Sequence, residues 1–187
     1  MIAASHIWWN LTRATANVSL ALLLLSIVLG VLMTTRALKK IDRPAWMRDL
    51  HSWLGGLALI FAGLHVVTLI LDNFVTFTIV NVLVPFASNW KPIPVALGIF
   101  SLYSLAAVQI TSLMMKKMDK QVWRRIHMLS YVLFATVVIH ALTAGSDVGK
   151  KAFTIFSVVI AMSGAAASGT RLVLGRYAVR RQTARAK

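Results

Sequence analysis

The sequence predicts an all-α integral membrane protein, a bundle of five transmembrane helices with one further interfacial or re-entrant segment at the outer face. Of its 187 residues, 58% are apolar and only 13% are charged, whereas about a quarter of the residues in soluble domains are charged. Five runs without Lys, Arg, Asp or Glu are long enough to cross a bilayer, which takes about 20 apolar residues. We expect one domain over residues 1–175 and a basic cytoplasmic tail over residues 176–187.

The five predicted spans are the charge-free runs themselves. They cover residues 14–35, 50–71, 92–115, 126–146 and 152–170. Trp8 and Trp9 precede the first span, as expected for an aromatic anchor at the outer interface. Small residues in the second span (Gly55, Gly56, Gly63) favour close helix packing or leave space for a flat cofactor. We expect the chain after Arg171 to be partly disordered.

Residues 73–90 are harder to assign, because they carry no charge and yet are not uniformly apolar. Asn81, Pro85, Ser88 and Asn89 interrupt the apolar residues of this stretch. A sixth span here would invert the topology of everything that follows. We therefore predict an outer-face interfacial helix or re-entrant segment, which either covers a site or is a simple connection.

The net charge of +15 follows the predicted topology. Most Lys and Arg lie in residues 36–48, 116–125 and 171–187, after the first, third and fifth spans. The positive-inside rule places these segments in the cytoplasm and the N-terminus outside, as in a bacterial plasma membrane. Contact with lipid headgroups explains this charge better than nucleic-acid binding. The absence of cysteine excludes disulfides, thiolate-held iron–sulfur clusters and heme attached through a Cys-x-x-Cys-His motif.

Four of the five histidines lie in two of the predicted spans, and His6 has no partner. His51 and His65 lie in the second span, and His127 and His140 lie in the fourth. An intramembrane ionisable residue is costly and marks a functional site by default. Because both spans run outward, His51 pairs with His127 near the cytoplasm and His65 with His140 further out. At about 1.5 Å per residue, the two levels are about 20 Å apart.

Two opposed imidazoles at each level suit the two axial positions of a b-type heme. Zinc prefers three or four protein ligands close together, and a proton relay or cation transporter would use acidic residues that these spans lack. Four buried histidines without a metal are the remaining alternative. The 13-residue spacing of His127 and His140 leaves them about 140° apart around an ideal helix. A bulge, a kink or different ring orientations would have to compensate for that angle.

The heme propionates need cationic or hydrogen-bonding partners. Arg13 is the candidate for the outer heme and Arg124 for the inner heme. Arg48 and Arg125 at the inner face, and Lys91 at the outer face, are further candidates. For each of these side chains, a purely topological charge is the alternative.

The histidine pattern resembles the ferric reductase-like transmembrane domain family, which includes NADPH oxidases, ferric-chelate reductases and small bacterial members. The matching motifs are His51-x13-His65 and His127-x12-His140. Trp123-Arg-Arg-Ile-His127 resembles the family's Trp-Arg-x-x-His, and Arg13 resembles a family arginine near the outer heme. The resemblance implies an inner heme on His51 and His127 and an outer heme on His65 and His140. It also implies electron flow from cytoplasmic NAD(P)H through flavin and both hemes to an external acceptor.

The 187 residues contain no recognisable flavin or nicotinamide domain. We therefore expect electrons from a separate cytoplasmic flavoprotein or from quinol, so that flavin takes part only through a partner. Ferric iron or its chelates, dioxygen, a quinone and a periplasmic protein are all possible acceptors. The hypothesis is transmembrane electron transfer through two bis-histidine b hemes. A quinol-coupled di-heme cytochrome b subunit of a larger complex and a heme carrier or sensor are alternatives, and an enzymatic activity of its own stays open.

Overall fold

The computed structural model describes residues 7–35, 44–73, 75–145 and 147–185. Its elements are α1 (Ile7–Thr35), α2 (Pro44–Leu71), α3 (Ile79–Leu83), α4 (Pro92–Leu113), the 3-10 helix η2 (Met115–Lys117), α5 (Lys120–Ala144) and α6 (Lys151–Arg185). Five of these helices, α1, α2, α4, α5 and α6, are long and apolar enough to cross a membrane. The predicted all-α fold with five spans is confirmed. His6 and residues 36–43 of the first basic loop lie outside the described residues.

Four of the five long helices, α1, α2, α5 and α6, begin before their charge-free runs, because a membrane helix continues into the polar interface. α1 begins at Ile7, so the predicted aromatic anchor and Arg13 lie within its first turns. α2 begins at Pro44, a residue that suits the first position of a helix. Asp119 caps α5, and its carboxylate accepts the backbone N–H of Gln121 at 2.8 Å and of Val122 at 3.0 Å.

The expectation of a partly disordered tail is wrong for the described part of that segment. α6 continues without a break from Lys151 to Arg185. The sequence after Arg171 contains Leu, Ala, Gln and several Arg, all good helix formers, and it has no proline. The helix propensity of these residues therefore outweighs their charge repulsion, which would favour disorder.

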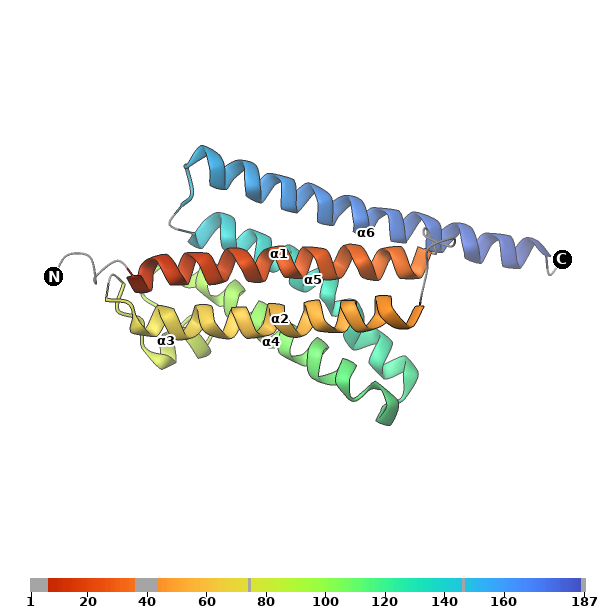
Figure 1. Ribbon diagram of the computed structural model, residues 1–187, viewed down its shortest axis with the longest axis horizontal. Coiled ribbons are helices and arrows are strands. Elements are labelled where there is room, and N and C mark those ends of the chain that lie inside the picture. Colours follow the sequence, from red (N-terminus) through yellow and green to blue (C-terminus); the bar gives the residue numbers. More distant parts are fainter. Residues whose placement is uncertain (1–6, 36–43, 74, 146, 186–187) are drawn as a thin grey trace.

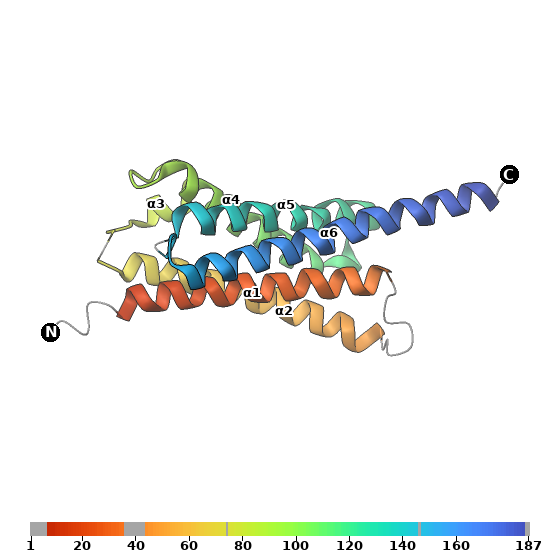
Figure 2. The same cartoon turned by 90° about the horizontal axis from the view of Figure 1, so that it is seen from above.

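The five long helices form two antiparallel hairpins and a fifth helix beside them. α1 packs along α2, α4 packs along α5, and α6 lies against α1 and α5 (Figures 1 and 2). A buried cluster holds the hairpins together. Its residues are Leu20, Leu23 and Ile27 of α1, Ala58 of α2, Leu105 of α4, Leu133, Phe134 and Val138 of α5 and Ile160 of α6. The hairpins therefore face one another across a common apolar interior.

The segment between α2 and α4 is not a sixth span. It contains α3, a helix of 5 residues that begins with a reciprocal capping box between Thr78 and Asn81. Phe77 and Val82 of this segment are buried against Val95 and Ile99 of α4. We call residues 75–90 the outer segment. It folds back over the end of the bundle, as the interfacial or re-entrant interpretation predicts.

Candidate functional site

The structure brings the four intramembrane histidines together as two pairs, one from α2 and one from α5 at each level. We call His51 and His127 the inner level, and His65 and His140 the outer level. The ring centroids of His51 and His127 are 5.9 Å apart, and their planes are inclined by 65°. His65 and His140 line one cavity and lie within electrostatic range of each other. These are the pairs that the common direction of the two spans predicts.

The inner-level spacing is suitable for a single metal ion between two imidazoles. Two metal–nitrogen bonds of about 2 Å, with the ring radii added, separate the ring centres by about 6 Å. Among the described residues, no group of three or more histidine or acidic side chains could hold a metal ion. A cofactor that brings its own equatorial ligands and needs only two axial ones therefore fits this donor set better than zinc does.

At the outer level, both histidines donate a hydrogen bond to a main-chain carbonyl of the neighbouring helix. His65 Nδ1 lies 3.0 Å from the Thr12 carbonyl of α1, and His140 Nδ1 lies 2.7 Å from the Pro94 carbonyl of α4. A carbonyl oxygen only accepts, so each Nδ1 carries the hydrogen. The lone pair of each neutral ring is then on Nε2, which is the usual arrangement of a metal-binding histidine.

At the inner level, the hydrogen-bond partners of both histidines belong to serine residues. His51 Nδ1 lies 2.9 Å from the Ser26 carbonyl and 3.1 Å from the Ser26 hydroxyl, both on α1. His127 Nδ1 lies 3.3 Å from the Ser112 hydroxyl on α4. Trp123, one turn before His127, stacks on its ring with centroids 5.2 Å apart and planes inclined by 28°. Each helix hairpin therefore supports its own two histidines.

Two glycines of the supporting helices make room for the imidazoles. A Cβ on Gly98 of α4 would lie 2.6 Å from Cε1 of His140, and a Cβ on Gly30 of α1 would lie 3.2 Å from Cε1 of His51. The glycines of the second span were the ones considered from the sequence. Of these, Gly55 faces the Gln109 side chain and a Cβ on Gly63 would meet nothing within 4 Å. Sequence reasoning missed Gly30 and Gly98 because only the fold places them opposite a histidine.

The outer level opens into a mostly apolar cavity of about 200 Å³. Residues of the outer segment form part of its wall. They are Val75, Phe77, Val82 and Trp90. Three non-glycine residues in and beside this segment, Thr76, Phe86 and Lys91, have positive φ angles of 47°, 67° and 43°. The outer segment thus contributes to the wall of this cavity, and whether it covers a site or is a simple connection stays a prediction.

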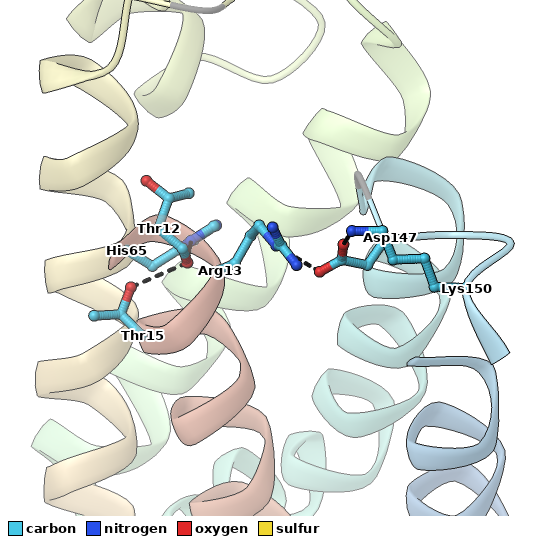
Figure 3. A network of polar contacts seen from close by, with 6 residues as sticks. All are labelled: Thr12, Arg13, Thr15, His65, Asp147 and Lys150. Atoms are coloured by element: carbon cyan, nitrogen blue, oxygen red, sulfur yellow. Dashed lines mark hydrogen bonds and ion pairs between the residues drawn. The ribbon is translucent and has the colours of Figure 1, made fainter. Parts of the chain in front are cut away.

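Arg13, the predicted outer-level cation, lies on the wall of this cavity, where it is paired with Asp147. Its Nε lies 2.5 Å from Asp147 Oδ2, and Lys150 Nζ lies 2.7 Å from Asp147 Oδ1 (Figure 3). Burial opposes ionisation of Asp147, but hydrogen bonds and charge from Lys150 and Arg13 outweigh it, and they hold the pKa of this carboxyl below its ordinary value of 3.8. Sequence reasoning did not identify Asp147 as a site residue, because Arg13 is 134 residues away in the sequence.

The predicted inner-level cation, Arg124, is exposed on the first turns of α5. Arg171 of α6, which was not among the predicted candidates, lies within electrostatic range of His127 and Tyr131. The sequence could not identify Arg171, because the position of α6 relative to α5 is a matter of tertiary packing. Two cations, one exposed and one near the ring, are thus available at this level.

The unfavourable rotation between His127 and His140 is accommodated without a bulge. α5 is recorded as a continuous α-helix from Lys120 to Ala144. Both Nδ1 atoms nevertheless bond to the same neighbour, α4, through Ser112 and Pro94. The structure therefore brings both rings to α4 without a bulge in α5.

Fold and site together define a five-span α-helical membrane protein with two levels of paired intramembrane histidines. A comparison with protein families matches residues 15–138 to the ferric reductase like transmembrane component, and the chain belongs to that family. The match includes His51, His65 and His127 and ends shortly before His140. Transmembrane domains of this family generally bind heme, and membership suggests transmembrane electron transfer. Searches of curated proteins and of solved structures gave no significant match.

Proposed function

We propose that this protein carries electrons across a bacterial plasma membrane through two b-type hemes, each held by one histidine pair. His51 and His127 would hold the inner heme, and His65 and His140 the outer heme. The observation that supports this most directly is the hydrogen bonding of the four rings. Three Nδ1 atoms face carbonyl oxygens, which leaves Nε2 as the ligating nitrogen of those rings. When bound, each heme supplies a one-electron couple at its iron.

The role of the polypeptide is to hold the ligands rigidly and to exclude water. An imidazole whose Nδ1–H is bonded to a carbonyl is fixed in orientation and is a more basic ligand. Each heme would be held by both imidazoles of one pair, so an external acceptor would take electrons at the heme edge rather than at the iron. The apolar wall of the outer cavity, with residues such as Leu102 and Leu133, keeps the surroundings dry.

The cations near the two levels suit the carboxylates of a heme. Arg13 lies at the outer level, where Asp147 fixes its guanidinium, and the remaining N–H groups of Arg13 would be free to bind a propionate. Arg124 and Arg171 would serve the inner heme. We keep the predicted orientation, with the N-terminus outside and the C-terminus in the cytoplasm. The donor would be a cytoplasmic flavoprotein or quinol, and the acceptor an outer-face oxidant.

The test is a heme count on purified protein. A reduced-minus-oxidised spectrum with a pyridine hemochrome assay should give two b hemes per chain for the wild type. His65→Ala and His127→Ala should each reduce the count to one, with different residual spectra, because they disrupt different levels. His6→Ala is the matched control and should keep both hemes. Wild-type protein without heme, or variants that both keep two hemes, would contradict the proposal.

A further inference from the structure

We infer that the Ser112 hydroxyl is the positioning group for His127 and that it sets the reduction potential of the inner heme, leaving the outer heme unaffected. The inference rests on the proposed function. It arises from one difference among the four histidines. His51, His65 and His140 each donate from Nδ1 to a main-chain carbonyl, at 2.9, 3.0 and 2.7 Å. His127 faces a side-chain hydroxyl at 3.3 Å instead.

The chemistry of a hydroxyl partner differs from that of a carbonyl. A serine hydroxyl both donates and accepts, so Ser112 by itself does not fix the tautomer of His127. Ligation through Nε2 would place the hydrogen of a neutral ring on Nδ1, and Ser112 Oγ would then be the acceptor. Within the described residues, Ser112 Oγ is the hydrogen-bond partner recorded for His127. This bond is therefore the side-chain contact through which the polypeptide can adjust the basicity of this ligand.

Loss of the acceptor should change the electronic properties of the site while the ring stays in place. A hydrogen bond from Nδ1 increases electron donation to the metal, which favours the ferric state. Without that bond the ligand donates less, and the potential should become more positive. The ring would still be held by Trp123, which stacks on it at 5.2 Å. We therefore expect Ser112→Ala to retain heme.

Main-chain carbonyls cannot be removed by substitution, so Ser112 is a suitable residue for this test. Thr111 provides a matched control, because its hydroxyl bonds to the carbonyl of Ala107 in its own helix at 2.6 Å and not to a histidine. Thr111→Val removes a hydroxyl from the same turn of α4. Ser112→Thr keeps a hydroxyl at the position and should restore the wild-type behaviour.

The experiment is a spectroscopic redox titration of the purified, heme-loaded protein. Ser112→Ala should shift the reduction potential of one of the two hemes to a more positive value. The expected shift is about 59 mV, which is a tenfold change in the equilibrium constant for one-electron reduction. The component that moves should be the one missing from His127→Ala. Ser112→Thr and Thr111→Val should match the wild type.

This experiment distinguishes failure of the proposed role of Ser112 from failure of the proposed function. Movement of both components together, of the outer component alone, or of neither would overturn the role of Ser112 while leaving a di-heme protein. Failure of Ser112→Thr to restore the potential would also overturn it, because the effect would then come from packing. A wild type without two b-type components would overturn the proposed function, and this inference with it.

Discussion

The outer and inner levels follow one plan but use different parts of the chain to fix their histidines. At the outer level, the carbonyls of Thr12 and Pro94 are the acceptors. At the inner level, His51 has both the carbonyl and the hydroxyl of Ser26, and His127 has a hydroxyl. A carbonyl is present whatever the side chain, whereas a hydroxyl is not. The outer level is therefore fixed mainly by the backbone, and the inner level depends more on side-chain identity.

The two levels also differ in how enclosed they are and in which charged side chains lie near them. The outer histidines line a cavity that the outer segment helps to wall off, with an ion-paired Arg13 at its edge. Of the inner histidines, His127 lies within electrostatic range of Arg171, and the exposed Arg124 precedes His127 on α5. The outer level is enclosed, and its cation Arg13 is neutralised by an ion pair. The inner level lies close to basic side chains. Under the proposed function, the inner level would meet the electron donor and the outer level would limit the access of the oxidant.

The largest effect should come from crowding the outer level with Gly98→Ala. Its Cβ would lie 2.6, 2.8 and 3.0 Å from Cε1, Nδ1 and Nε2 of His140, a ring that its bond to Pro94 holds in place. We expect outer-heme occupancy to fall at least about tenfold, as for loss of ligand support. A hemochrome count on the purified variant measures this loss. Gly63→Ala is the control, because its Cβ would meet nothing within 4 Å. A Gly98→Ala variant with two hemes would show that the outer level is not rigid.

Gly30→Ala should produce a smaller loss at the inner level. The added Cβ would lie 3.2 Å from Cε1 of His51, so a displacement of a few tenths of an ångström relieves it. At the lower end of the usual overpacking cost, about 1 kcal/mol, the affinity for the inner heme would fall about fivefold. The same heme count, repeated at increasing heme concentration, should recover the missing heme. An inner loss greater than the outer loss in Gly98→Ala would reverse the proposed order of rigidity.

The sequence predicts the fold and the histidine pairs well, because both depend on simple periodic constraints. Charge-free runs of bilayer length predict the spans, and the common direction of two spans predicts which histidines share a level. The ends of the helices were less accurate, because α6 continues to Arg185 through residues whose charge indicated disorder. A charge-free run marks only the part of a helix that lipid surrounds.

The supporting residues were beyond sequence reasoning for a different reason. Ser26, Gly30, Pro94 and Gly98 are ordinary residues of membrane helices, and nothing in their local sequence connects them to a histidine on another helix. Their role depends on which helices are neighbours and on how the helices are rotated. The same applies to Asp147, whose partner Arg13 is 134 residues away in the sequence.

The smallest expected effect concerns the ion pair at the edge of the outer level. The native pKa of Asp147 is depressed, so its contribution to stability is present above the ordinary value of 3.8 and is lost as the pH falls through the native pKa. Because Lys150 is largely exposed, we expect Asp147→Asn to cost only about 0.5 kcal/mol at neutral pH. Thermal unfolding in detergent, followed by circular dichroism at pH 7 and at a series of values below 3.8, should show the two proteins converging in acid. Asp49→Asn, which removes an exposed carboxylate, is the control. A stability difference that persists unchanged in acid would mean that Asp147 acts through packing, and the outer level would then owe nothing to charge compensation.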